Sequence, residues 1–360
     1  MLFAMHIPDG FLALPAAVVC AIVAALALTL AVRCLARQQG ERFVPLLGVT
    51  AAGLFAGQMV NFPLLGLQTS GHLMGGVLAA VILGPWGAMV AIASVLLVQC
   101  FLFGDGGVTA LGANLLNMGV IGGMLGYAVY STLRRAIGGN FGTVAAAVLA
   151  SWIIIPVSAL AFSVEMAAGG GIEFMPLVTL MVFYHVWIGL GEAVLTGLVT
   201  QWLVRVRPDL IYQPNAAEGR LARAGRVVAA GLAVAVAVAV FLAPWASSFE
   251  DGLERVAIRL GFDDRATSAA WSPFPDYEWP WVTRAMAAEN GTPTKVEQEV
   301  EPTAGADQAE HSVEVGWLPA AGMTTSLLGL IGTLATCVVA WAIGRGACQA
   351  ARMGRANASG

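Results

Sequence analysis

Long apolar runs recur along the 360 residues of this chain, and they constrain its fold more than any other feature. Most of them approach the roughly 20 residues that a helix needs to cross about 30 Å of hydrocarbon. Hydrophobic residues make up 58% of the sequence and charged residues only 11%, and the mean hydropathy is +0.78. Soluble domains do not have this composition. The chain is therefore predicted to be an all-α polytopic membrane protein.

We expect seven helices in an N-terminal core and two further helices that flank an extracytoplasmic loop. The nine spans are placed at residues 11–32, 44–62, 72–84, 86–103, 111–133, 141–163, 176–204, 225–245 and 317–344. The predicted domains are a transmembrane domain over 1–204, an arginine-rich cytoplasmic linker over 205–224, a second domain over 225–345 with its loop at 246–316, and a cytoplasmic tail over 345–360.

Arginine near the ends of spans marks the cytoplasmic side of a membrane protein. With the N-terminus outside, thirteen of the 18 basic residues fall on the inner side. These thirteen are Arg33, Arg37, Arg42, Arg134, Arg135, Arg205, Arg207, Arg220, Arg223, Arg226, Arg345, Arg352 and Arg355. The other five lie in the outer loop 246–316, where 14 acidic residues outnumber them and where loop length makes charge unimportant.

The same rule decides whether residues 72–103 cross once or twice. A single pass would place the later arginines on the wrong side, so two passes are predicted. The first pass, from His72 to Gly84, has only about 13 residues and spans about 20 Å as a helix. His72 is therefore expected to lie below the outer surface.

A histidine near the start of the chain suggests a metal site. If Met5 is the functional first residue, its amine, the backbone nitrogen of His6 and the His6 imidazole can form adjacent chelate rings around one ion. His72 would supply a fourth nitrogen. Such a set suits Ni²⁺ or Cu²⁺, and late divalent metals generally, far better than Mg²⁺ or Ca²⁺. The leader Met1-Leu2-Phe3-Ala4 would place the amine too far away, and residues 1–10 lack the basic region of a secretory signal.

Polar residues inside a membrane are costly and usually have a partner or a task. Gln58 and Asn61 share a helical face, as do Asn114 and Asn117, and these amides could position the metal-binding loop or simply join helices. His185 and Glu192 are seven residues apart, so they could form a gating or proton-linked pair. The alternative is a buried, hydrogen-bonded histidine and its neighbour.

Several patterns are missing from the sequence. It has no G-x-x-x-x-G-K-[ST] loop, no G-x-S-x-G elbow and no H-E-x-x-H, so neither ATP hydrolysis nor other enzyme chemistry is expected. The five cysteines include no C-x-x-C pair. No prosthetic group and no nucleic-acid partner are expected. The acidic loop could attract divalent cations or be a solvated linker, with His311 exposed and not expected to bind metal.

Five motifs in the first 200 residues carry a family resemblance. They are Met5-His6-Ile7-Pro8-Asp9-Gly10-Phe11-Leu12, Gln58-Met59-Val60-Asn61-Phe62-Pro63, Thr69-Ser70-Gly71-His72-Leu73-Met74-Gly75-Gly76, Leu83-Gly84-Pro85-Trp86 and Phe103-Gly104-Asp105-Gly106-Gly107. Together they resemble the CbiM/NikM family, the substrate-capturing components of energy-coupling factor (ECF) transporters for cobalt and nickel.

This resemblance implies that the Met5 amine, the backbone nitrogen and side chain of His6, and the His72 imidazole bind Co²⁺ or Ni²⁺ as cargo. It also implies a CbiQ/NikQ-like membrane coupling subunit and CbiO/NikO-like cytoplasmic ATPases in a bacterial inner membrane. Cobalt uptake would serve cobalamin synthesis, and nickel uptake would serve nickel enzymes. The leader before Met5 departs from the family pattern.

The C-terminal third resembles the accessory subunit CbiN/NikN, which has two spans around an outer loop. The resemblance lies in Ser247-Ser248-Phe249-Glu250-Asp251-Gly252-Leu253-Glu254 and Ser272-Pro273-Phe274-Pro275-Asp276-Tyr277, which look like the PDGLE domain. Glu250 stands where the pattern has proline. The fusion is somewhat more typical of nickel-type proteins. Two alternatives stay open, namely a stand-alone secondary metal transporter or channel and a membrane metal sensor.

Overall fold

The computed structural model of the chain describes residues 6–38, 43–64, 66–169, 172–214, 224–267, 272–279 and 319–359. Met5, His311, residues 215–223 of the predicted linker and most of the predicted outer loop lie outside these ranges. Within them, six helices are long and apolar enough to cross a bilayer. They involve α1 (Leu14–Gln38), α3 (Gly76–Val98) with the π-helical turn Gln99–Phe103, α6 (Gly139–Ala167), α7 (Phe174–Val206), α8 (Ala224–Ala237) with the turns to Trp245, and α11 (Pro319–Ser359).

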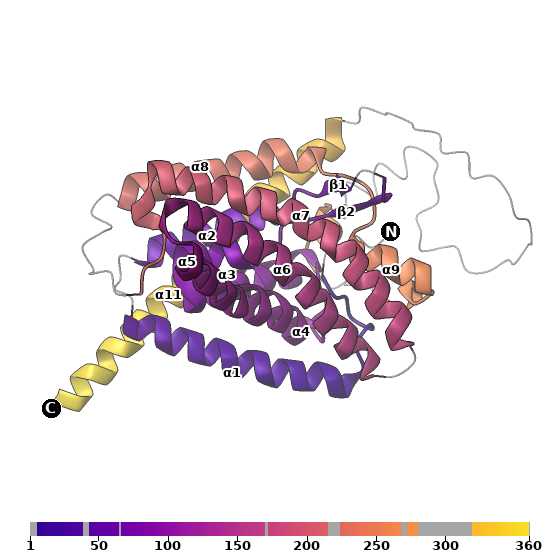
Figure 1. The fold of residues 1–360 in the computed structure, drawn as a ribbon, viewed down its shortest axis with the longest axis horizontal. Coiled ribbons are helices and arrows are strands. Elements are labelled where there is room, and N and C mark those ends of the chain that lie inside the picture. The colour runs from indigo at the N-terminus through magenta and orange to yellow at the C-terminus, as the bar shows by residue number, and fades with distance from the viewer. Residues whose placement is uncertain are drawn as a thin grey trace, which may run out of the picture.

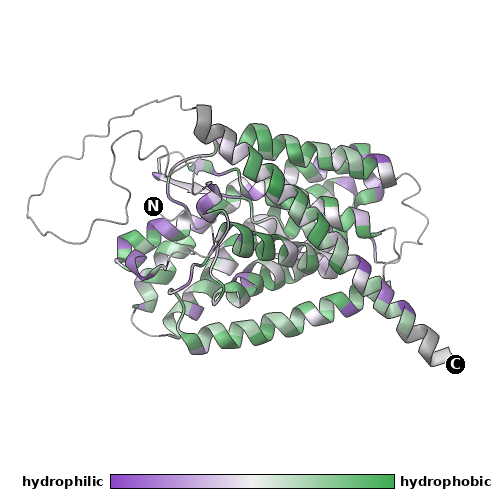
Figure 2. Cartoon of the chain, turned by 180° about the vertical axis from the view of Figure 1, so that it is seen from behind, coloured by the Kyte–Doolittle hydropathy of each residue, from purple (hydrophilic) through white to green (hydrophobic). Residues whose placement is uncertain are grey.

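Shorter helices complete the bundle. The second is α2 (Val44–Gln58), and a continuous helical segment is formed by α4 (Leu111–Leu115), the π-helix Leu116–Leu125 and α5 (Gly126–Ile137). The long helices run side by side, and their apolar residues dominate the outward faces (Figures 1 and 2). The predicted fold class, an all-α polytopic membrane protein, is thus confirmed. The number of crossings and the outside location of the N-terminus stay predictions.

Two boundaries differ from those expected. The span predicted at 44–62 ends as a helix at Gln58, and the chain then forms a small antiparallel pair, β1 (Phe62–Leu64) with β2 (Thr69–Gly71). The turn between them uses Gly66 at φ +84° and Gln68 at φ +49°, which no continuous helix allows. The last helix continues through the predicted tail, where alanine and arginine favour helix.

The chain breaks its helix at Gly84. This residue has φ +73° and ψ +176°, a conformation that glycine adopts readily, and Pro85 follows it. A Cβ atom on Gly84 would lie 2.6 Å from the ring of Tyr212, so glycine is also needed for close packing. The Tyr212 amide donates to the Val81 carbonyl at 2.8 Å, which fixes the segment after α7 against this break.

Packing against α2 shows that the two parts of α3 run in opposite directions. Its start contacts the end of α2, its middle contacts the beginning of α2, and its end returns to the end of α2. The three contacts are Gly75 with Leu54, Gly87 with Phe43, and Phe103 with Phe55. How many times residues 72–103 cross a bilayer stays a prediction.

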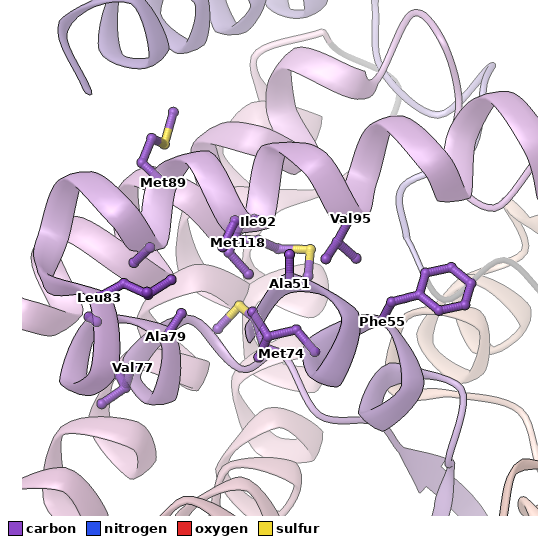
Figure 3. Close-up of a cluster of buried hydrophobic side chains, with 14 of the residues drawn as sticks. Ala51, Phe55, Met74, Val77, Ala79, Leu83, Met89, Ile92, Val95 and Met118 are labelled. Atoms are coloured by element: carbon purple, nitrogen blue, oxygen red, sulfur yellow. The ribbon is translucent and has the colours of Figure 1, made fainter. Parts of the chain in front are cut away.

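Most of α3 is buried at the centre of the molecule. Val77, Leu83, Met89 and Ile92 belong to one apolar cluster that also includes residues of α2 (Figure 3). The remainder of the bundle is arranged around this helix. Residues 246–267 and 272–279 belong to the predicted outer loop and are called the outer segment below. They include a short amphipathic helix, α9 (Gly252–Leu260), which packs Val256 and neighbouring apolar residues against the first half of α7.

Backbones approach closely where α3 meets the π-helix. A Cβ atom on Gly76 would lie 2.5 Å from the carbonyl carbon of Gly122, which cannot move without displacing a helix. We expect Gly76→Ala to destabilise the fold by about 1–3 kcal/mol through overpacking. The matched control is Gly53→Ala, because Gly53 lies within α2 and a Cβ atom added there would meet nothing within 4 Å. Thermal unfolding in detergent should give a lower midpoint for Gly76→Ala only, and equal midpoints would contradict this packing.

Candidate metal centre

The N-terminal segment enters the bundle as extended backbone. The Asn114 side chain binds both polar groups of Ile7, since its Oδ1 accepts from the Ile7 amide at 3.0 Å and its Nδ2 donates to the Ile7 carbonyl at 3.1 Å. The Gly107 amide donates to the same carbonyl at 2.9 Å. Buried backbone groups need such partners, so Asn114 holds the chain in place directly after His6.

Asp9 fixes the other end of this segment. Its carboxylate accepts hydrogen bonds from the amides of Val108 and Thr109 at 3.1 and 2.7 Å, and from the Thr109 hydroxyl at 2.5 Å. The loop approaches so closely that a Cβ atom on Gly107 would lie 2.3 Å from the Asp9 amide nitrogen. The need for glycine at position 107 is thereby explained.

His6 and His72 meet at the end of this segment. Their rings stack with centroids 5.7 Å apart and an interplanar angle of 22°. His6 is buried, with 3% of its surface exposed, and His72 follows strand β2 with its Nδ1 3.3 Å from the Leu73 carbonyl oxygen. The structure therefore brings together the two histidines singled out in the sequence, although they are far apart along the chain. Met5 lies outside the described residues.

A cavity of about 110 Å³ lies beside the two rings. Its lining combines polar residues of the bundle with residues of the outer segment. The polar lining includes His6, His72, His185, Asn114, Asn117 and Asp251. Among the residues that the structure describes, no group of three or more His, Cys, Asp or Glu side chains could hold a metal ion alone.

The loop that follows His72 is anchored from within the bundle. Gln58 donates from Nε2 to the Met74 carbonyl at 3.1 Å. The Glu192 carboxylate accepts from the amides of Met74 and Gly75 at 2.6 and 2.8 Å, at the N-terminus of α3. Negative charge is favourable at that position. Gln58 thus has the loop-positioning contact expected for it.

The sequence left open whether His185 and Glu192 pair with each other, and in the described part of the chain they do not. His185 Nδ1 lies 2.7 Å from the carbonyl oxygen of Met181 in its own helix, and Glu192 is committed to backbone amides. The reason is geometric. The amides of Met74 and Gly75 at the N-terminus of α3 have no partner within that helix, and they point at Glu192. A role of the two residues in gating has no contact to support it here.

Asn117 and Asn61, the other two amide residues singled out in the sequence, have different partners. Asn117 lines the cavity and donates from Nδ2 to Glu165 Oε2 at 2.9 Å. Asn61 accepts the Ser247 amide through its backbone carbonyl at 2.9 Å, which joins the residue before β1 to the outer segment. Glu165 was not singled out from the sequence, since an isolated carboxyl in an apolar helix gives no indication of its partner.

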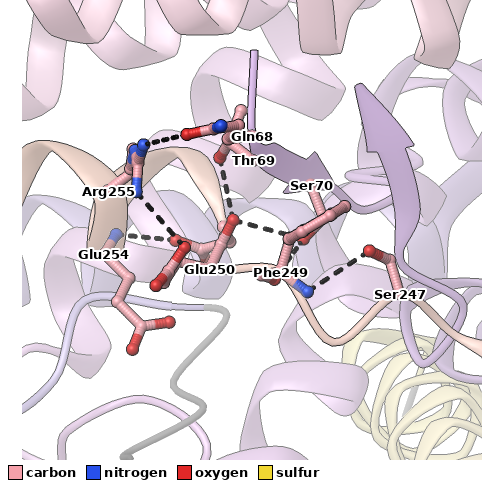
Figure 4. A network of polar contacts seen from close by, with 9 residues as sticks. Gln68, Thr69, Ser70, Ser247, Phe249, Glu250, Glu254 and Arg255 are labelled. Atoms are coloured by element: carbon pink, nitrogen blue, oxygen red, sulfur yellow. Dashed lines mark hydrogen bonds and ion pairs between the residues drawn. The ribbon is translucent and has the colours of Figure 1, made fainter. Parts of the chain in front are cut away.

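The outer segment covers the cavity beside His72. The Ser70 amide and the Thr69 hydroxyl both donate to the Glu250 carbonyl at 2.8 Å, and the Ser70 hydroxyl donates to the Phe249 carbonyl at 2.8 Å (Figure 4). Arg255 Nη1 lies 3.6 Å from Glu250 Oε2. Strand β2, which carries the chain into His72, is therefore bonded on one edge to β1 and also to this segment.

The sequence Asp251-Gly252-Leu253-Glu254 has a clear local structure. Asp251 caps α9, accepting from the Glu254 amide at 2.7 Å, and burial raises the pKa of its carboxyl to about 7. Burial and the neighbouring Asp251 and Glu250 charges likewise raise the pKa of Glu254 to about 7. A Cβ atom on Gly252 would lie 2.6 Å from Ile188, so only glycine allows this approach to α7.

Two further residues next to His6 were not identified from the sequence. Asp105 is buried, and its Oδ1 lies 3.7 Å from His6 Nδ1. Its Oδ2 accepts from the Tyr277 hydroxyl at 2.9 Å. Burial and the Asp105 charge raise the pKa of Tyr277 well above its usual range, so this hydroxyl keeps its proton. Both residues belong to quoted motifs, but nothing in the sequence indicated that the motifs meet.

Family models match both parts of the chain. The model described as the cobalt uptake substrate-specific transmembrane region matches residues 6–210, and the PDGLE domain model matches residues 225–347. The two matched ranges flank the segment predicted as a linker. The first range contains His6, His72 and the loop at Asp105, and the second contains the outer segment that covers the cavity.

Several relatives share one or both parts. A protein of Archaeoglobus fulgidus named as a putative fused nickel transport protein, NikMN, is 37% identical over 77% of this chain and 89% of its own length. The fused nickel transport protein NikMN of Rhodobacter capsulatus is 38% identical over 58% of this chain and 64% of its own. The cobalt transport protein CbiM of Sorangium cellulosum is 32% identical over 58% of this chain and 94% of its own.

One solved structure agrees with this picture. The crystal structure of a truncated transition metal transporter has a TM-score of 0.50 and 30% sequence identity, and the match covers 55% of this chain and 98% of that one. The first family model alone covers more than half of the chain. This multi-pass membrane protein therefore belongs to the family of cobalt uptake substrate-specific transmembrane proteins and carries a PDGLE domain in its C-terminal part.

Proposed function

We propose that this chain is the metal-capturing component of an energy-coupling factor transporter that imports Ni²⁺ or Co²⁺. The ion is held by the Met5 amine, the backbone nitrogen and imidazole of His6, and the imidazole of His72. Separate subunits hydrolyse ATP and reorient the loaded protein. The observation that carries this proposal is the stacking of the His6 and His72 imidazoles beside a small cavity at the fixed start of the chain.

The geometry supports a nitrogen-rich site more than an oxygen-rich one. The carboxylates of Asp9, Asp251 and Glu192 each accept backbone amide hydrogens, so each holds a segment of the chain in place. Asp105 lies 3.7 Å from His6 Nδ1 and is placed beside the nitrogen donors, outside the proposed donor set. Nitrogen donors select late transition metals over Mg²⁺ and Ca²⁺. Between the two candidate ions, Ni²⁺ is proposed first, because relatives with the fused arrangement are named as nickel transport proteins.

The alternatives differ in what they need for uptake. A stand-alone transporter would carry metal without other proteins, whereas a sensor would bind it without transport. The proposed component needs a CbiQ/NikQ-like coupling subunit and CbiO/NikO-like ATPases. Radioactive nickel uptake into cells that express the chain with and without these subunits separates the three cases. Uptake that persists without the ATPases would overturn the ECF assignment.

His72 provides a direct test of the metal site. We expect His72→Ala to abolish high-affinity Ni²⁺ binding, because the ring supplies one donor and cannot be replaced by solvent with equal strength. Equilibrium dialysis of the purified full chain, with metal quantified by mass spectrometry, measures this. His311→Ala is the control, since His311 was not expected to bind metal and should leave binding unchanged. Normal retention by His72→Ala would remove this residue from the site.

The chain terminus gives a second test. A version that begins at Met5 should bind Ni²⁺ tightly, and one that retains Met1-Leu2-Phe3-Ala4 should bind far more weakly, because its amine cannot join the chelate rings. Intact-protein mass spectrometry establishes which terminus each sample has. Equal affinity of the two forms would contradict coordination by the amine.

The affinity should depend on pH in a defined direction. Amine and imidazole must lose their protons before they bind metal, and their ordinary pKa values are about 8 and about 6.5. Binding should therefore be strongest above about pH 8 and weaken progressively as the pH falls toward about 6. Dialysis across this range measures the trend, and a constant affinity would indicate donors that do not titrate there.

A further inference from the structure

A second part of the PDGLE domain docks next to His6. The segment Ser272–Tyr277 lies against residues 102–105, with the Phe274 amide donating to the Leu102 carbonyl at 3.0 Å. The Tyr277 ring stacks on Phe103 with centroids 4.4 Å apart and an interplanar angle of 14°. The sequence motif that includes Tyr277 has no role in the metal chemistry described so far.

The backbone of this segment is held in an uncommon conformation. Asp276 and Tyr277 have φ values of +55° and +58°, in the left-handed region that residues with side chains rarely occupy. Such conformations persist only where surrounding contacts enforce them, and they cluster at functional sites. Here the enforced conformation directs the Tyr277 side chain into the interior, where only 9% of the residue is exposed.

The hydroxyl of Tyr277 ends a chain of three buried groups. It donates to Asp105 Oδ2 at 2.9 Å, while Asp105 Oδ1 lies 3.7 Å from His6 Nδ1. Asp105 and His6 are 2% and 3% exposed. The accessory domain thus contacts a carboxylate that faces the ring nitrogen of a proposed metal ligand.

We propose that Tyr277 is a positioning residue through which the PDGLE domain sets the metal affinity of the His6 site. This inference rests on the proposed function. A divalent cation in a buried site needs negative charge nearby, and Asp105 is the carboxylate placed to supply it. The Tyr277 hydroxyl fixes the orientation of that carboxylate by donating a hydrogen bond to it. Partners of this outer kind strongly affect metal affinity in proteins.

The PDGLE domain therefore contacts the segments that position both histidines. Residues 249–250 bond to strand β2, which leads into His72, and Tyr277 bonds to Asp105, which faces His6. Docking of one domain therefore orders both sides of the cavity. Loss of the Tyr277 hydroxyl alone should weaken metal binding at His6 and leave the hydrogen bonds to strand β2, which leads into His72, intact.

The test uses Tyr277→Phe in the full chain. The variant keeps the ring that stacks on Phe103 and removes only the hydroxyl, so thermal unfolding in detergent should stay close to that of the parent. We expect Ni²⁺ affinity, measured by dialysis against a competing chelator, to fall about 10-fold or more. Tyr212→Phe is the control, because Tyr212 packs on Gly84 away from the cavity, and its affinity should equal that of the parent.

A double-mutant cycle asks whether Tyr277 acts through Asp105. If it does, Tyr277→Phe should have little further effect in an Asp105→Asn background. Equal losses in both backgrounds, or unchanged affinity in Tyr277→Phe, would overturn the inference. If Asp105→Asn does not fold, the ligand-field absorption of the nickel-loaded protein decides, since a shift is expected for Tyr277→Phe and none for Tyr212→Phe. Failure of the parent chain to bind Ni²⁺ would instead refute the proposed function.

Discussion

Burial of extended backbone is the constraint on which the rest of the structure depends. The segment that follows His6 enters the bundle without forming a helix, so its amides and carbonyls need partners that a helix would supply internally. Asn114 forms two hydrogen bonds with Ile7, and Asp9 accepts from the loop at 108–109. The loop can approach only because Gly107 lacks a side chain. His6 is therefore fixed by groups outside the proposed donor set.

The side of the cavity formed by His72 is held in place by two separate parts of the chain. Gln58 and Glu192 hold the loop after His72 from within the transmembrane core, and residues 249–250 hold strand β2 from the PDGLE domain. A covalent link between the two domains raises the effective concentration of one at the surface of the other. In a fused chain the outer contacts therefore form without a separate binding step.

Some of this organisation could be predicted from the sequence. The long apolar helices follow from hydropathy, and the break in α3 falls at Gly84-Pro85, because turn chemistry is local. The convergence of His6 and His72 was also predicted. The hairpin at 62–71 was not predicted, since its first strand is apolar and continues the pattern of the preceding span. The roles of Glu192 and Tyr277 depend on pairings between segments more than 100 residues apart, which one sequence does not reveal.

Four carboxylates in the segments that form the cavity differ in the groups from which they accept hydrogen bonds. Asp9, Glu192 and Asp251 accept from backbone amides at the loop, at the start of α3 and at the start of α9, so each holds a piece of chain in place. Moving Glu192 or Asp251 would leave the backbone amides at the start of α3 or of α9 without these partners, which costs free energy. Asp105 instead accepts from a side-chain hydroxyl and faces His6. Among these four it is the carboxylate that lies beside the ring of a proposed metal ligand.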